Sequence, residues 1–237
     1  MARGKDRTAE TLAGLQVAVT LAAVHTTLLR MVNVLHDITS SSQPELLAKL
    51  RSEIENLKAE FPDWPPHVYD KMHLMDSVLR ESQRMSPSTM VGMKRIFKTS
   101  HTFSNGLHLA KGTYVCIPTF FIENDPDLIP DPEHFDGFRS YRAFRHDQAK
   151  EFRFSSPDYL ALGFGFGRAA CPGRFFATLV LKMVFAKLLT EFDFRSQGRP
   201  PRFSLYEFNL YSTDQEMWIR RRMTTDDAVN KGSVVNI

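Results

Sequence analysis

Residues 162–177 read Leu162-Gly-Phe-Gly-Phe-Gly-Arg-Ala-Ala-Cys-Pro-Gly-Arg-Phe-Phe-Ala177, and they are the most informative part of the chain. Three glycines alternate with phenylalanines, and a cysteine then stands directly before a proline and the start of an apolar helical pattern. The glycines permit tight turns and the close approach of a flat partner. Because the free N–H groups and the dipole at a helix start lower the pKa of a nearby thiol, we expect Cys171 to be a thiolate.

A single thiolate at the start of a helix has several chemical uses. A zinc site needs three or four ligands, whereas Cys116, the other cysteine, lies in an apolar strand pattern that suits packing. A catalytic nucleophile needs a histidine base, and a phosphate loop needs a following Lys-Ser/Thr pair. The eight histidines are scattered, and no such pair follows Gly167. Zinc and phosphate are therefore disfavoured, while a nucleophile, a redox sensor, an axial haem ligand and a packed core loop stay open.

The pattern Phe164-x-x-Gly167-x-x-x-Cys171-x-Gly173, followed by Arg174-Phe-Phe-Ala177, resembles the haem-binding signature of the cytochrome P-450 superfamily. The resemblance implies that the Cys171 thiolate is the proximal ligand of the iron of haem b, and that its electron donation favours O–O cleavage. Ala169 departs from the signature, because the family usually has His or Arg there against a haem propionate. The residues that the resemblance assigns to cofactor binding are Phe164, Gly165, Gly167, Arg168, Cys171, Gly173 and, from the distal side, Ala23.

A second part of the resemblance is an ion network that supports the cysteine loop. Glu81 and Arg84 match the Glu-x-x-Arg motif, and their spacing of three puts both side chains on one face of a helix. A lone surface pair of this kind is worth only about 0.3 kcal/mol. The resemblance adds Arg139, which ends the segment Pro132-Glu-His-Phe-Asp-Gly-Phe-Arg139, as the third member. Gly137 and Ser140 replace the proline and the phenylalanine that are common beside this arginine.

Residues 8–38 predict one long helix, because apolar side chains recur along them at a helical spacing. Within it, Ala22-Ala-Val-His25-Thr26-Thr27 resembles the variant of the oxygen-activating motif seen in fungal secondary-metabolism members of the family. The resemblance implies that this helix crosses the distal face of the haem. Thr26 would then hold the water relay that delivers protons to oxygen, and His25 would replace the usual acid as a proton shuttle. A core helix with incidental threonines is the structural alternative.

By the same resemblance, residues 88–92 and 208–213 line the substrate side of the haem. The side chains expected there are Ser88, Thr89, Met90, Val91 and Asn209. Basic residues around the cysteine are candidates for a surface that docks an acidic reductase, although solvated charges explain them equally well. These residues are Arg168, Arg174, Lys182 and Lys187.

The remaining pattern predicts a mainly α fold with small β-sheets, of the α+β class. Helices are expected over 45–60, 71–85 and 174–192, where apolar residues recur at a helical spacing. Strands are expected over 91–98 and 113–118, with a final strand pair at 203–211 and 217–221. Three prolines make 124–138 an irregular connection. We expect residues 1–222 to be the C-terminal haem-binding part of the family's domain, and 223–237 to be a loose tail.

Composition narrows the class of protein without choosing a function. The chain has 237 residues, 43% of them apolar, and a formal charge of +3 that is spread along it, which disfavours nucleic-acid binding. Two cysteines cannot build a disulfide framework. Leu15–Leu29 carries Gln16, His25 and two adjacent threonines, and Phe175–Leu189 carries two lysines, so we expect neither segment to span a bilayer. The chain is therefore expected to have no membrane anchor of its own.

The resemblance covers nearly the whole chain, which corresponds to the C-terminal half of a complete family member. It implies a haem-thiolate monooxygenase that oxidises an apolar small molecule in secondary-metabolite biosynthesis, with electrons from NADPH through NADPH-cytochrome reductase. The full-length protein is expected at the endoplasmic reticulum membrane, on its cytoplasmic face. The alternatives are a truncated, non-catalytic remnant or haem-binding module, and a family member that performs isomerisation or dehydration without a reductase.

Overall fold

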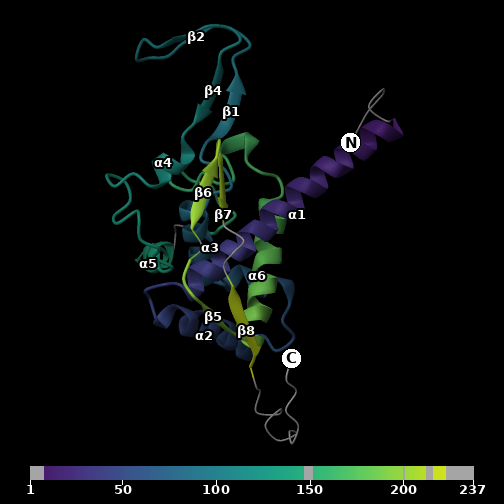
Figure 1. Cartoon of the computed structure of the whole chain (residues 1–237), viewed down its shortest axis with the longest axis vertical. Coiled ribbons are helices and arrows are strands. Elements are labelled where there is room, and N and C mark those ends of the chain that lie inside the picture. Colours follow the sequence, from purple (N-terminus) through teal and green to yellow (C-terminus); the bar gives the residue numbers. More distant parts are fainter. Residues whose placement is uncertain (1–7, 147–151, 200, 212–215, 223–237) are drawn as a thin grey trace, which may run out of the picture.

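Figure 1 shows the computed structural model of the chain, which describes residues 8–146, 152–199, 201–211 and 216–222. The described residues are mainly helical with small two-stranded sheets, as the sequence predicts, and the predicted tail at 223–237 lies outside them. The helices are α1 (Ala9–Thr39), α2 (Glu45–Glu60), α3 (His73–Met85), α4 (Thr119–Glu123), α5 (Arg139–His146) and α6 (Arg174–Glu191). Short 3-10 turns, η2 and η3, occupy Pro66–Lys71 and Gly167–Ala169.

The strands form antiparallel pairs. Near the top of Figure 1, β1 (Gly92–Ile96) pairs with β4 (Tyr114–Ile117), and β2 (His101–Thr102) with β3 (His108–Leu109). Closer to the helices, β5 (Phe192–Ser196) pairs with β8 (Met217–Arg221), and β6 (Arg202–Leu205) with β7 (Phe208–Tyr211).

Helix α1 agrees with the predicted long helix. It begins after Thr8, whose Oγ1 accepts the N–H of Thr11 at 3.2 Å and so caps the helix start. The buried residues of α1 lie in its C-terminal part, from Arg30 to Ile38. The earlier turns are exposed, and Figure 1 shows this purple part reaching away from the other helices. The packing of α1 on the rest of the protein is therefore concentrated at its C-terminal end.

The prediction that no segment is able to span a bilayer is not supported for α1. This helix is long and apolar enough to cross a membrane by length and composition. The reason is that residues 11–29 contain no Asp, Glu, Lys or Arg, and Gln, His and Thr within a long apolar run weigh less than charges do. A core helix of a protein passes the same test of length and composition. The finding therefore concerns the length and hydrophobicity of α1, and it does not place the helix in a membrane.

Buried polar groups hold the C-terminal end of α1. Arg30 donates to the carbonyl of Ser86 at 3.0 Å, and Arg199 pairs with Asp37 at 2.6 Å. Burial raises the pKa of the Asp37 carboxyl, which the nearby arginine lowers in part. These contacts join α1 to the end of α3 and to Arg199, so the helix is fixed in position by polar pairs as well as by apolar packing.

The hydrophobic core lies where α2, α3 and α6 meet the end of α1. Each helix contributes buried side chains three or four residues apart, the spacing that puts them on one face. Burying each large side chain contributes about 2 kcal/mol. These residues are Val34 and Ile38 of α1; Leu46, Leu50 and Ile54 of α2; Met75, Val78 and Leu79 of α3; and Leu181, Phe185 and Leu189 of α6.

The C-terminal strands pair differently from the prediction. The sequence predicts that 203–211 pairs with 217–221, but β6 and β7 form a hairpin with each other, and β8 pairs with β5. The predicted helix over 174–192 concealed β5, because apolar residues continue from the helix into Phe192-Asp-Phe-Arg-Ser196. Helices α4 and α5 were not predicted either, since five and eight residues are too few for a clear helical period.

Buried charges connect α2, α3 and α6. The Lys182 ammonium of α6 pairs with Asp76 of α3 at 2.7 Å and also donates to the carbonyl of Tyr69 at 2.8 Å. From α2, Glu53 accepts the N–H groups of Leu74 at 2.7 Å and Met75 at 3.1 Å, and so caps α3 in place of a local side chain. Burial raises the pKa of the Glu53 carboxyl to about 7.

Lys182→Met leaves Asp76 buried without its cation, so we expect it to lower the free energy of unfolding by about 3–5 kcal/mol. The matched control is Lys187→Met on the same helix, because the Lys187 side chain is 73% exposed and pairs with Glu191 at the surface. We expect the control to change stability very little. Urea unfolding followed by circular dichroism measures both variants, and equal losses would contradict this account of the buried pair.

A pH profile tests the burial of Glu53. A carboxyl whose pKa is higher in the folded than in the unfolded chain stabilises the protein below the unfolded pKa, and this stabilisation is lost as the pH rises through the folded pKa. As the pH rises from 4.5 to about 7, the free energy of unfolding of the parent should therefore fall by roughly 3 kcal/mol through ionisation of Glu53. Glu53→Gln should not show this part of the fall. Urea titrations at pH 4 and pH 8 measure the difference, and parallel profiles for parent and variant would refute it.

Candidate functional site

The cysteine loop runs from Leu162 to the start of α6. Gly165 and Gly167 have φ of +75° and +62°, a left-handed backbone that glycine adopts without strain. The Cys171 N–H donates to the Phe164 carbonyl at 2.8 Å and closes the loop on itself. The Cys171 thiol is free and exposed, and α6 begins three residues later at Arg174. The sulfur therefore stands at a helix start, as the sequence predicts, and at the protein surface.

The side chains of Leu162, Phe164 and Arg174 anchor the loop. Leu162 is buried, and Phe164 packs edge-on against the buried Phe154 with ring centroids 4.9 Å apart. The Arg174 guanidinium donates to the carbonyl of Cys171 at 2.8 Å and to that of Ser155 at 3.1 Å. The loop is therefore held at its ends, while residues 166–169 between them are exposed.

The exposed part of the loop is suited to a flat ligand bound through sulfur. A Cβ at Gly167 would meet no heavy atom within 4 Å, so the space beside it is open. Phe166 offers an exposed ring, and Arg168 is an exposed cation with no carboxylate partner among the described residues. The described residues contain no cluster of three or more His, Cys, Asp and Glu side chains that could hold a metal ion. A metal at this loop would therefore have Cys171 as its single protein ligand among the described residues, and its other ligands would come from a cofactor.

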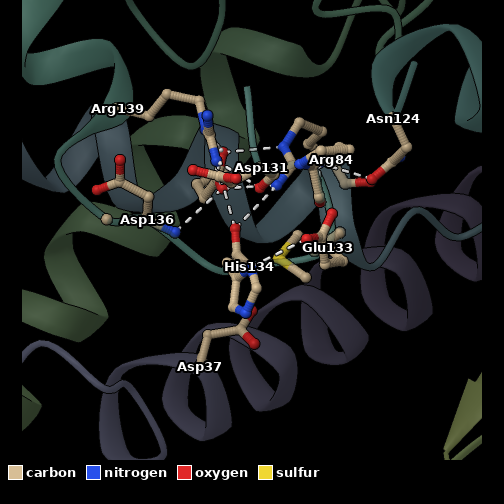
Figure 2. Close-up of polar contacts among 12 residues, drawn as sticks. Asp37, Arg84, Asn124, Asp131, Glu133, His134, Asp136 and Arg139 are labelled. Carbon is tan, nitrogen blue, oxygen red and sulfur yellow. Dashed lines mark hydrogen bonds and ion pairs between the residues drawn. The ribbon is translucent and has the colours of Figure 1, made fainter. Parts of the chain in front are cut away.

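Beneath the loop, the carboxylate of Glu81 pairs with two arginines. Arg84 reaches Oε1 through Nη2 at 2.6 Å and Oε2 through Nε at 3.0 Å, and Arg139 reaches Oε2 at 3.1 Å. Glu81 is only 3% exposed. Figure 2 shows the two guanidinium groups converging from α3 and from the start of α5. The spacing of three residues on one helix thus produces a buried pair, and the tertiary fold adds the third member.

The same arginines hold the irregular stretch that the prolines predict. Arg84 donates to the carbonyl of Pro132 at 2.7 Å, and Arg139 donates to that of Pro130 at 2.6 Å. Gly137 has a structural reason to replace the common proline. A Cβ there would lie 2.7 Å from Cδ2 of Leu46, and the Gly137 N–H donates to Gln43 at 3.0 Å, a bond that proline cannot make.

The two segments expected on the substrate side lie together. The Met90 N–H donates to the Glu207 carbonyl at 2.7 Å, the Asn209 N–H donates to the Ser88 carbonyl at 3.4 Å, and Thr89 bridges to Phe208. Val91 follows directly, before β1. The last residues of the expected segment, 212–213, lie outside the described residues. Backbone pairing between residues 88–90, which precede β1, and the β6–β7 hairpin therefore gathers these residues.

The structure does not join the expected distal residues to the cysteine loop. Ala23, His25 and Thr26 lie on the exposed part of α1, and the Thr26 hydroxyl donates to the carbonyl of Ala22 at 2.6 Å on the same helix. Among the described residues, no hydrogen bond, ion pair or ring contact connects them to the Cys171 loop. Their side chains are accessible, and their arrangement around a ligand is not formed by the described residues alone.

The expected basic docking surface needs a correction. Lys182 is buried and paired with Asp76, and Arg174 is engaged with two backbone carbonyls. Arg168 and Lys187 are the exposed members. The sequence could not distinguish buried from exposed basic residues here. A lysine on an apolar helix gives the same pattern whether its ammonium pairs inside the protein or extends into solvent.

Sequence reasoning missed one functional candidate, Glu123 at the end of α4. Its side chain is 2% exposed, and its Oε1 accepts the N–H of Leu162 at the entry of the cysteine loop. Burial raises the pKa of its carboxyl to about 7, although the Leu162 N–H and the charges of Arg80 and Arg84 oppose this shift. An acid that directly follows an apolar Phe-Phe-Ile run was the available signal.

A family model for cytochrome P-450 matches residues 2–215, which is most of the chain. The chain belongs to the cytochrome P-450 family. The predicted resemblance is therefore confirmed, and membership of this monooxygenase family implies a haem-thiolate cofactor. The exposed Cys171 thiol and the open glycine loop fit such a group.

Several fungal proteins are similar to this P-450 chain. An ent-kaurene oxidase of Gibberella intermedia is 31% identical over 95% of the chain and 44% of its own length. The cytochrome P-450 monooxygenase braC of Annulohypoxylon truncatum is 35% identical over 90% of the chain and 43% of its length. The cytochrome P-450 monooxygenase olcJ of Penicillium canescens is 34% identical over 96% and 43%. The chain thus spans less than half the length of the curated relatives it matches.

The Glu81 network predicts a large effect on stability. Glu81→Ala leaves Arg84 and Arg139 without their shared anion, and we expect the free energy of unfolding to fall by about 3–5 kcal/mol. Glu133→Ala is the control, since Glu133 is exposed on the adjacent segment and its ion pair, with His134, is at the surface. Urea unfolding compares them, and a loss below about 1 kcal/mol for Glu81→Ala would show that the buried carboxylate does not organise this region.

Proposed function

We propose that the chain is the haem-ligating part of a P-450 monooxygenase that oxidises an apolar small molecule in secondary-metabolite biosynthesis. The observation that carries the proposal is the exposed Cys171 thiol, at the start of α6, within a loop that two left-handed glycines shape. A cysteine in this position would be free to ligate iron through its sulfur.

Residues of the loop would hold haem b through complementary contacts. Cys171 supplies the thiolate ligand, and Gly165, Gly167 and Gly173 leave the space that a flat macrocycle needs. Phe164 fixes the loop, and Arg168 offers an exposed cation for a propionate in place of the absent basic residue at Ala169. When bound, the haem would activate dioxygen with electrons that come from NADPH through a reductase.

Side chains of α1 would manage protons on the distal side. The Thr26 hydroxyl already donates to the Ala22 carbonyl, so its oxygen keeps lone pairs with which to accept a hydrogen bond from a relay water. His25 beside it is exposed, and its imidazole would take the place of the usual acid in the proton relay. Ala23 has a small side chain, which permits the close approach of a flat ligand to the helix.

Substrate selection would depend on the residues that the β6–β7 hairpin gathers. Ser88, Thr89, Met90 and Val91 would contribute to the substrate side from the segment before β1, and Asn209 from the hairpin, because the two backbones are hydrogen-bonded. An apolar substrate suits this mixed, largely uncharged set. The similarity to fungal monooxygenases supports secondary metabolism, and the full-length protein would act at the cytoplasmic face of the endoplasmic reticulum.

A second candidate function is a non-catalytic haem-binding module. The exposure of His25 and Thr26 favours it, because a distal side open to water does not control proton delivery. The two candidates differ in a measurable way. NADPH-dependent product formation with a cytochrome reductase is expected of the monooxygenase, whereas haem binding without turnover is expected of the module.

A haem reconstitution experiment tests the proposed ligand. The chain with added haem, reduced under carbon monoxide, should give the absorption shift of a thiolate-ligated haem, and Cys171→Ala should abolish it. Cys116→Ala is the matched control, because Cys116 is also a free, exposed thiol. The shift should survive in this control. A parent without the shift, or a Cys171→Ala variant that keeps it, would overturn the proposal.

A further inference from the structure

The entry of the cysteine loop is held by one buried carboxylate. Leu162 is the buried residue of the loop, and its N–H donates to Oε1 of Glu123, the last residue of α4. The Leu162 carbonyl accepts the N–H of Gly165 at 2.7 Å. Both backbone groups of Leu162 are therefore engaged, one with the protein interior and one with the loop itself.

This hydrogen bond is the main polar contact of Glu123, whose carboxyl also lies close enough to the Gly163 N–H for that group to lower its pKa in part. Its second oxygen, Oε2, is buried and has no hydrogen-bond partner among the described residues. The two nearest arginines have other partners, because Arg80 pairs with Asp158 and Arg84 with Glu81, each at 2.6 Å. A buried acid that is not part of an ion pair is costly to keep, and the hydrogen bond from Leu162 offsets part of this cost.

The next residue connects this carboxylate to the Glu81 network. Asn124 accepts a hydrogen bond from Arg84 Nη1 at 2.6 Å, and its side-chain nitrogen donates to the Arg84 carbonyl at 3.2 Å. Figure 2 shows Asn124 and Arg84 facing each other. Glu123 and Asn124 thus bond in sequence order to the loop and to the network beneath it.

A second contact presses the same part of the loop against α3. A Cβ at Gly163 would lie 2.7 Å from Cγ of Gln83, so the loop backbone lies directly on this side chain. Gln83 stands between Glu81 and Arg84 along α3. The loop entry is therefore located by α3 from one side and by Glu123 from the other.

We propose that Glu123 is a positioning residue for the cysteine loop, which transmits the placement of the Glu81–Arg84–Arg139 network to Cys171 through the Leu162 N–H. The inference rests on the proposed role of Cys171 as the iron ligand. Loss of the Glu123 acceptor leaves a buried N–H unsatisfied, and the loop gains freedom at the point where it leaves the interior. Cys171 is bonded to the same loop through the Phe164 carbonyl and follows that movement.

Amide hydrogen exchange on the full chain without haem tests the positioning role directly. Glu123→Ala should make the amides of Leu162, Gly165 and Cys171 exchange at least about tenfold faster, because their hydrogen bonds open locally. Glu123→Gln keeps a carbonyl acceptor of the same length, and it should restore the parent rates to within about threefold. Unchanged loop exchange in Glu123→Ala, or no rescue by Gln, would overturn the inference.

Glu53→Ala is the matched control. Glu53 is also a glutamate that accepts backbone N–H groups and whose pKa is raised by burial, but it caps α3 and has no hydrogen bond to the loop. It should leave exchange of the three loop amides at the parent rate. Equal acceleration by Glu53→Ala would assign the effect to general loss of stability and refute a specific role for Glu123.

A second readout separates this inference from the proposed function. After haem reconstitution, Glu123→Ala should convert a larger fraction of the reduced, carbon monoxide-bound sample to the form without thiolate ligation, and Glu53→Ala should not. If the parent itself shows no thiolate signature, the proposed function fails, while the exchange rates still decide whether Glu123 positions the loop. A parent signature that Glu123→Ala leaves unchanged would count against transmission to Cys171.

Discussion

The buried carboxylate of Glu81 stabilises the arrangement on which the candidate site depends. An isolated anion in the protein interior would be costly, and two guanidinium groups compensate it from α3 and α5. The remaining donors of Arg84 and Arg139 then bind the carbonyls of Pro130 and Pro132, which no regular structure satisfies. One charge cluster therefore fixes an irregular, proline-rich segment that could not hold its shape through its own hydrogen bonds.

Hydrogen bonds of two adjacent residues connect this cluster to the cysteine loop. Asn124 binds Arg84, Glu123 binds the N–H of Leu162, and the loop closes with the hydrogen bond from Cys171 to Phe164. Glu123 and Leu162 are buried, whereas the Cys171 thiol and Gly167 are exposed. This division suits a site whose ligand is large and flat, because the buried groups hold the loop in place while the side that carries the thiol stays accessible.

Particular residues show which features were predictable from the sequence. Long helices such as α1 and α2 were predictable because their apolar period extends over many turns, and the Glu81–Arg84 pair because three residues separate its members on one helix. The short helix α5 and the strand β5 were not, since their signals are shorter than one clear period. The burial of Lys182 was not predictable either, because its partner Asp76 lies on another helix.

The sequence by itself determined the family, through a cysteine before a helix and glycines at fixed spacing, and it determined the mainly helical class through its apolar periods. These are local properties, because covalent geometry and backbone conformation dictate them within a few residues. Only the tertiary structure decided that β8 pairs with β5, that Lys182 is buried, and that Glu123 holds the loop entry. In each case a strand edge, a charge or an N–H group becomes buried and needs a polar partner. The partner lies far away in the sequence, so only the folded chain determines which group it is.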